Sequence, residues 1–159
     1  MAKVFLICGK ICSGKSTYAK QLQAANQSVI LSVDEIMLAV FGLYVGEKHD
    51  EYAANVRNYL FKKSLEVIQA DVSVILDWGF WTKAGRSEAK EFYRSRNIEC
   101  ELHYIDISKE IWEARINQRN QSVIAGESTA YIVDCNLAEK FESRFEQPTK
   151  EEIDVWVGE

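Results

Sequence analysis

An excess of positive charge, a paired cysteine motif and a long apolar leader are all missing from this sequence. The 159 residues carry 19 Lys and Arg against 24 Asp and Glu, a net charge of −5. This balance argues against a surface that follows a long nucleic-acid backbone, although a nucleic-acid end could still enter a local basic pocket. The four cysteines show no CxxC spacing, which predicts free thiols in a reducing cytosol.

The sequence also lacks repeats, linkers and low-complexity segments, and it has a single proline, Pro148. Its N-terminus has neither the pattern of a signal peptide nor that of a membrane span. A chain of 159 residues that is 47% apolar is long enough to bury one α/β core and too short for two. We therefore expect one domain over residues 1–159, a cytoplasmic location and no membrane partner.

The most informative stretch is GKICSGKS, residues 9–16, which fills the pattern G-x-x-x-x-G-K-[ST]. An apolar run precedes it and an amphipathic helix pattern follows it, as a phosphate-binding loop requires. In such a loop the glycines let backbone N–H groups surround phosphate oxygens, Lys15 reaches the β- and γ-phosphates, and Ser16 gives a hydroxyl to Mg²⁺. The alternative is a glycine-rich turn with a surface lysine. The predicted nucleotide-binding residues of this loop are Gly9, Ile11, Cys12, Ser13, Gly14, Lys15, Ser16 and Thr17.

Short apolar runs alternate with amphipathic stretches along the chain. The runs predict strands at residues 4–8, 29–33, 72–76, 99–107 and 153–157, and the stretches predict helices at 14–25, 35–41, 51–70, 82–96, from 108 onward and at 137–145. This alternation is typical of parallel βαβ units with helices on both faces of the sheet, so we expect an α/β fold. Ligands then bind at the carboxyl ends of the strands.

Two aspartates close neighbouring predicted strands. Asp77 ends the run VSVIL, as a Walker-B carboxylate does, and is a candidate to hold Mg²⁺ directly or through water; the alternative is a turn cap. Asp34 ends the run VILSV and is a candidate to accept the proton of a substrate hydroxyl; the alternative is a cap of the helix that begins at Glu35. Both aspartates should meet the glycine-rich loop at one edge of the sheet.

Arg115 and Arg119 are four residues apart and therefore share one face of a predicted helix. Guanidinium groups there can clamp a transferring phosphoryl group and stack on adenine, and the alternative is a pair of surface arginines. The softer segment 120–130 that follows is a candidate for a mobile lid. Weaker acceptor-binding candidates are His49, Arg57 and Arg86, for each of which a solvated position is the alternative. The aromatics Trp78, Phe80 and Trp81 predict either an acceptor-binding wall or core packing.

Five stretches, in order over nearly the whole chain, resemble one family: GKICSGKST, LSVDEIM, VILDWGFWTK, RINQRN and FEQPTKEE. They are similar to small P-loop kinases of the AAA-domain ATPase-like group, such as polynucleotide 5′-hydroxyl kinases, zeta toxins and chloramphenicol phosphotransferase, and more distantly gluconate and shikimate kinases. The resemblance implies a three-layer P-loop NTPase fold, a five-stranded parallel sheet in the order 2-3-1-4-5 and a helical lid. It favours ATP and implies roles for the residues that follow: Lys15 and Ser16 on nucleotide and Mg²⁺, Asp34 as acceptor base, Arg115 and Arg119 in the lid, and Phe145 and Pro148 near the adenine.

Three functions are compatible with these features. The first is a Mg²⁺-dependent kinase, a monomer or dimer, that moves the γ-phosphoryl group of ATP to a hydroxyl of a small molecule, with Lys15, Asp34, Arg115 and Arg119 in catalysis and with Ser16 and Asp77 on the metal. The second is phosphorylation of nucleic-acid 5′ ends, which predicts a basic entrance near Arg57, Lys62, Lys63 and Arg86. The third is a nucleotide-switched binding module without an acceptor.

Overall fold

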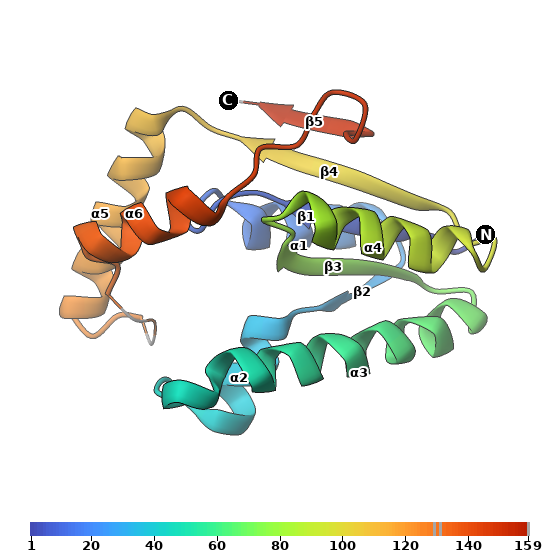
Figure 1. Cartoon of the computed structure of the whole chain (residues 1–159), viewed down its shortest axis with the longest axis horizontal. Helices are drawn as coiled ribbons and strands as arrows, with labels where there is room; N and C mark the ends of the chain where they lie inside the picture. Colours follow the sequence, from blue (N-terminus) through green and yellow to red (C-terminus); the bar gives the residue numbers. More distant parts are fainter. Residues whose placement is uncertain (129, 131, 159) are drawn as a thin grey trace.

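Every pair of neighbouring strands in the sheet is parallel (Figure 1). The computed structural model describes residues 1–128, 130 and 132–158. In this part of the chain the strands stand in the order β2-β3-β1-β4-β5, which confirms the predicted order and α/β class. The strands are β1 (Val4–Cys8), β2 (Ser28–Leu31), β3 (Ser73–Gly79), β4 (Cys100–Asp106) and β5 (Val155–Gly158).

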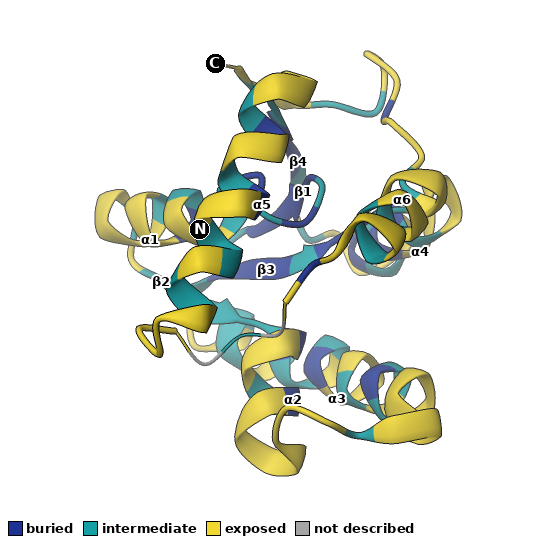
Figure 2. Ribbon diagram, turned by 90° about the vertical axis from the view of Figure 1, so that its left-hand side faces the viewer, coloured by how far each residue is buried: buried dark blue, intermediate teal, exposed yellow. Residues whose placement is uncertain are grey.

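Helices cover both faces of the sheet, so the molecule has three layers (Figure 2). Helix α1 lies on one face, whereas α3 and α4 lie on the other. The helices are α1 (Lys15–Ala25), α2 (Val33–Phe41), α3 (His49–Gln69), α4 (Lys83–Arg94), α5 (Lys109–Ile124) and α6 (Cys135–Arg144), with a 3-10 turn η1 at Gly46–Lys48. No helix in the described residues is long and apolar enough to cross a membrane.

The central strands are buried on both faces, which explains why they read as continuous apolar runs rather than as alternating ones. In β1 the odd-numbered Phe5 and Ile7 pack toward Ala19 of α1. The even-numbered Val4 and Leu6 pack toward the opposite layer. The core on that side of the sheet also contains Val74, Leu76 and Leu102 of the strands and Ala89 and Tyr93 of α4.

Strand β2 ends earlier than the sequence predicted because Ser32 caps the helix that follows it. Ser32 Oγ accepts a hydrogen bond from the backbone N–H of Glu35 at 3.3 Å. Asp34 therefore lies in the first turn of α2 rather than at a strand end, and the alternative interpretation of Asp34 as the helix cap is wrong. Asp77 lies inside β3, which continues to Gly79, so it is not a turn cap either.

The ends of the remaining helices follow their capping residues. Thr82 Oγ1 accepts from the N–H of Gly85 and starts α4 as predicted, and Ser108 caps α5 in the same way. Helix α3 begins at His49 and runs unbroken to Gln69. The first five residues of the predicted lid, 120–124, are helical, whereas Thr129 within that segment lies outside the described residues.

Arg86 on α4 is buried, with 1% of its surface exposed. Its Nε donates to Oε1 of Glu152 at 2.9 Å, and its Nη1 donates to the carbonyl oxygens of Phe80 at 3.0 Å and Glu146 at 2.8 Å. The guanidinium thus ties α4 to the turn after β3 and to the C-terminal segment. The expectation that Arg86 binds an acceptor or lines a basic entrance is wrong.

Replacing Arg86 with methionine should lower the free energy of unfolding by about 3–5 kcal/mol, because the carboxylate of Glu152 and two buried carbonyls lose their donor. Urea denaturation measures this change. A matched control is Lys63→Met, which removes the exposed pair of Lys63 with Glu66 and should leave stability almost unchanged. Equal effects of the two substitutions would contradict the structural role of Arg86.

Candidate active site

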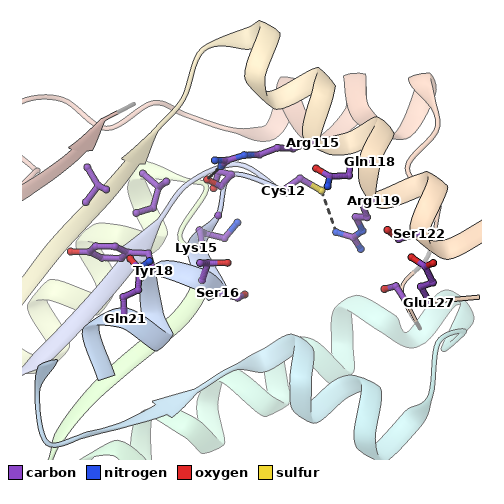
Figure 3. A pocket seen from close by; sticks show the side chains of 16 residues that line it. Cys12, Lys15, Ser16, Tyr18, Gln21, Arg115, Gln118, Arg119, Ser122 and Glu127 are labelled. Carbon is purple, nitrogen blue, oxygen red and sulfur yellow. Dashed lines mark hydrogen bonds between the residues drawn. The ribbon is translucent and has the colours of Figure 1, made fainter. Parts of the chain in front are cut away.

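The predicted phosphate loop joins β1 to α1 and lines a pocket of about 800 Å³ (Figure 3). Gly14 adopts φ +97°, a backbone conformation that favours glycine, and it lies beside the guanidinium of Arg115. No side chain caps the N-terminus of α1. Its first N–H groups therefore face a site suited to an anion.

Side chains hold the carbonyl oxygens of the loop. Trp81 Nε1 donates to Gly9 O at 3.2 Å, and Trp112 Nε1 donates to Ile11 O at 2.6 Å. Arg115 Nη1 donates to Ser13 O at 2.7 Å. A loop whose carbonyls are engaged in this way keeps a conformation in which N–H groups remain for phosphate oxygens. Trp81 was predicted as acceptor wall or core, and it both packs against the core cluster of Ile11 and Trp112 and supports the loop. The sequence had not singled out Trp112.

Replacing Trp112 with phenylalanine should weaken nucleotide binding about tenfold, because an unpaired Ile11 carbonyl lets the loop relax, a loss near 1.4 kcal/mol. Isothermal titration with an unhydrolysable ATP analogue measures the affinity. The matched control is Trp78→Phe, which removes an indole bond of 2.9 Å to Leu31 O, outside the loop. The control should lose comparable stability and keep its affinity, and equal affinity losses would contradict a specific role of Trp112.

Lys15 folds back onto the loop. Its Nζ donates to the carbonyl oxygen of Lys10 at 2.6 Å. Burial lowers the pKa of Lys15 below its usual value, and the charges of Asp77 and Asp34 oppose this shift. The ammonium thus lies near both carboxylates, as the predicted convergence of the loop with Asp34 and Asp77 requires.

Asp77 and Ser16 meet beside the loop, where Ser16 Oγ donates to Oδ2 of Asp77 at 2.8 Å. Asp77 is only 9% exposed, and burial raises its pKa, although the bond from Ser16 and the charge of Lys15 oppose that shift. The described residues contain no cluster of three His, Cys, Asp or Glu side chains that would hold a metal by themselves. This donor set suits Mg²⁺, which takes one or two protein oxygens and completes its shell with phosphates and water.

Asp34 lines a second pocket, of about 530 Å³, together with Ser16 and Asp77. Because Ser16 lines both pockets, the two meet at the predicted cation site. The exposed Asp34 carboxylate also influences the pKa values of Lys15 and Asp77, which places its charge near both groups.

Arg115 and Arg119 extend from one face of α5 over the first pocket (Figure 3). Besides the bond of Arg115 to Ser13 O, Nη1 of Arg119 donates to Sγ of Cys12 at 3.4 Å. Both guanidinium groups therefore contact the loop that they were predicted to face.

Comparison with known proteins agrees with this geometry. A family model described as an AAA domain matches residues 4–148. The chain belongs to this AAA domain family. No curated protein is similar enough in sequence to count as a relative.

Solved structures share the fold of this AAA domain. A Chloroflexus aurantiacus protein with a provisional kinase assignment has a TM-score of 0.74 at 16% identity, over 99% of this chain and 86% of that one. Chaetomium thermophilum Kti12, solved with ADP-AlF3, has a TM-score of 0.69 at 19% identity, over 98% of this chain and 88% of that one. Mycobacterium tuberculosis APS kinase CysC, in complex with AMPPNP and APS, has a TM-score of 0.62 at 17% identity, over 99% of this chain and 88% of that one. These likenesses show that the AAA domain has a P-loop NTPase fold.

The first pocket of this AAA domain has lining residues that the sequence did not single out. Two of them, Tyr18 and Gln21, follow Thr17 on the pocket face of α1, and helical spacing could have found them. Ile105 and Val157 are register partners on β4 and β5, so only the sheet brings them together. The lining residues missed were Tyr18, Gln21, Ile105, Gln118, Ser122, Glu127, Ser128 and Val157.

Several predicted site residues of this AAA domain lie elsewhere. Phe145 lines a third pocket of about 280 Å³ with Lys10 and Tyr104, and this pocket shares Ser13 and Ile105 with the first. Pro148 is buried. The implied place of Phe145 and Pro148 near the adenine stays a prediction. Neither the first nor the second pocket is lined by the α3 residues His49, Arg57, Lys62 and Lys63. Trp78 in β3 and Phe80 just after it do not line these pockets either, and both pack in the core, as one of the two alternatives predicted. The four cysteines are free, as their spacing predicted.

Proposed function

We propose that this AAA domain is a Mg²⁺-dependent kinase that transfers the γ-phosphoryl group of ATP to a hydroxyl of a small molecule. The observation that carries the proposal is the meeting of two pockets at Ser16. One pocket contains the phosphate loop and the arginines of α5, and the other contains a carboxylate suited to orient a hydroxyl. A nucleotide switch needs only the first.

In this proposal the nucleotide binds in the first pocket. The loop N–H groups, Lys15 and the N-terminus of α1 provide for the phosphates, while Arg115, Tyr18, Gln21 and Val157 offer a planar cation, an aromatic ring, an amide and an apolar side chain for the base and ribose. The relatives of similar fold solved with AMPPNP and ADP-AlF3 favour ATP. We also propose that residues 1–159 form one kinase domain that works in the cytoplasm.

In the proposed reaction, the acceptor hydroxyl loses its proton to Asp34 as its oxygen bonds to the γ-phosphorus. The bond from that phosphorus to the bridging oxygen breaks, and ADP leaves. Lys15, Arg115 and Arg119 compensate the charge of the transferring group. Ser16 and Asp77 would hold Mg²⁺, which neutralises charge on the phosphates when bound.

The proposal is tested by following ADP formation from ATP with and without hydroxyl compounds. A kinase with this site releases ADP slowly on its own and faster when an acceptor occupies the second pocket. The Lys15→Met protein should show neither activity. ADP formation that depends on Lys15 but responds to no hydroxyl compound would favour a nucleotide switch and overturn the kinase proposal.

A further inference from the structure

The side chains that line the second pocket indicate which acceptor it can bind. The wall residues are Ser16, Lys20 and Gln23 of α1, Val29 and Ile30 of β2, Asp77 of β3, and a remaining group at the start of α2. Those remaining α2 residues are Asp34, Glu35 and Leu38, with Ser32 before them. A cavity of about 530 Å³ suits a small molecule rather than a polymer.

The charges that face this pocket are mostly negative. Asp34, Glu35 and Asp77 line it against a single ammonium, that of Lys20, and no arginine or histidine is among the lining residues. Lys15 does not line this pocket but lines the first one, where the phosphates of the proposed nucleotide would neutralise its charge. Sites for carboxylate, sulfate or phosphate groups generally use arginine, whose forked donors match such anions in pairs.

The three lining carboxylates have different positions and therefore different proposed roles. Asp77 is bonded to Ser16 at the proposed cation site, and Asp34 is placed for the acceptor hydroxyl. Glu35 has neither task, and its side chain is exposed on the pocket wall. Two further lining residues, Val29 and Leu38, are 39% and 43% exposed and offer apolar surface.

We infer that the acceptor is a hydroxyl compound that is uncharged or carries an amine, has an apolar part and bears no anionic group. Glu35 would pair with the amine or accept from a further hydroxyl, and Val29 and Leu38 would cover the apolar part. This inference rests on the proposed function for the hydroxyl. It excludes sugar acids, phosphorylated compounds and nucleic-acid 5′ ends as acceptors.

The test uses matched compounds and two readouts on the full chain with Mg²⁺ and AMPPNP. One set is glucosamine, glucose and gluconate, and the other is tyramine, tyrosol and 4-hydroxyphenylacetate, with a 5′-hydroxyl oligonucleotide as the polyanion. Backbone amide shifts of Asp34, Glu35 and Leu38 report binding. We expect the amine or neutral members to move these amides and the acids to bind at least about tenfold more weakly. Shifts from the acids or the oligonucleotide alone, or from no compound, would overturn the inference.

Reversing the charge of Glu35 tests its role directly. Glu35→Lys should weaken binding of the amine about tenfold and improve binding of the acid, whereas Glu88→Lys, on the exposed surface of α4, should change neither. Thermal unfolding checks that both variants are folded. Equal responses of the two variants would contradict the role of Glu35.

Transfer of γ-label from ATP is the second readout, and it separates the two proposals. Amide shifts by an amine without label transfer to any compound would leave the ligand class standing and remove the kinase proposal. Transfer confined to acidic acceptors would support the kinase and overturn the inferred class.

Discussion

We expect the replacement of Lys15 with methionine to lower phosphoryl transfer by about a thousandfold or more, because in the proposed reaction the transferring group loses a positive charge beside it. We expect nucleotide affinity to fall as well, since Lys15 is the loop lysine that lines the first pocket, whereas Lys10 does not line it. The rate is measured as ADP formation in the presence of an acceptor, and the affinity by calorimetric titration.

The same substitution should not destabilise the folded protein. In the unfolded chain Lys15 has its usual pKa, whereas burial lowers its pKa in the folded state, so the folded state holds this proton less tightly. The buried ammonium is thus a penalty below the lowered pKa, and methionine removes it. The expected free energy of unfolding is equal to or higher than that of the wild type.

A matched control for this prediction is Lys62→Met, an exposed lysine of α3 that lines neither pocket. It should keep full activity. A Lys15→Met protein that transfers phosphate at more than about a tenth of the wild-type rate would contradict the assignment of the loop as a catalytic phosphate site.

Replacing Asp34 with asparagine has a different signature, namely a loss of transfer with nucleotide affinity kept. Asp34 lines the second pocket and not the first, so the nucleotide contacts remain. General-base catalysis contributes about 10²–10⁴-fold, and asparagine accepts no proton at neutral pH, so a fall in kcat of this size is expected.

Three measurements on Asp34→Asn decide between roles. Titration with AMPPNP gives the affinity, acceptor-dependent ADP formation gives kcat, and urea denaturation shows that α2 keeps its stability. Glu88→Gln, an exposed carboxylate on α4, is the control and should behave as wild type. An equal loss of nucleotide affinity and transfer would show that Asp34 acts on the nucleotide site rather than on an acceptor.

The sequence predicted those parts of the molecule that local pattern determines. Continuous apolar runs occur where strands are buried on both faces, and the alternation of runs and amphipathic stretches gave the α/β class. The sheet order came from the family resemblance. The glycine-rich motif predicted a loop between a strand and a helix correctly, because the geometry of such a loop requires those residue types at fixed spacing.

Predictions failed where a contact between distant segments decides the outcome. Arg86 looked like a surface cation, but Glu152, 66 positions away, pairs with it and draws it into the core. Trp112 carried no motif, yet its indole reaches Ile11, 101 positions earlier. The end of β2 depended on a local cap, Ser32, which competed with Asp34 two residues later, so Asp34 was misplaced relative to that strand end. Asp77 was misplaced for another reason, because β3 continues past it to Gly79.

The most direct test of the account is recovery of the γ-label of ATP on a hydroxyl compound in the presence of Mg²⁺. We expect labelled product with the wild-type chain from an uncharged or amine-bearing acceptor, almost none with Asp34→Asn, and none with Lys15→Met. Label released only as inorganic phosphate by the wild type, with every acceptor supplied and with no effect of Asp34→Asn, would contradict the proposal that this AAA domain is a kinase.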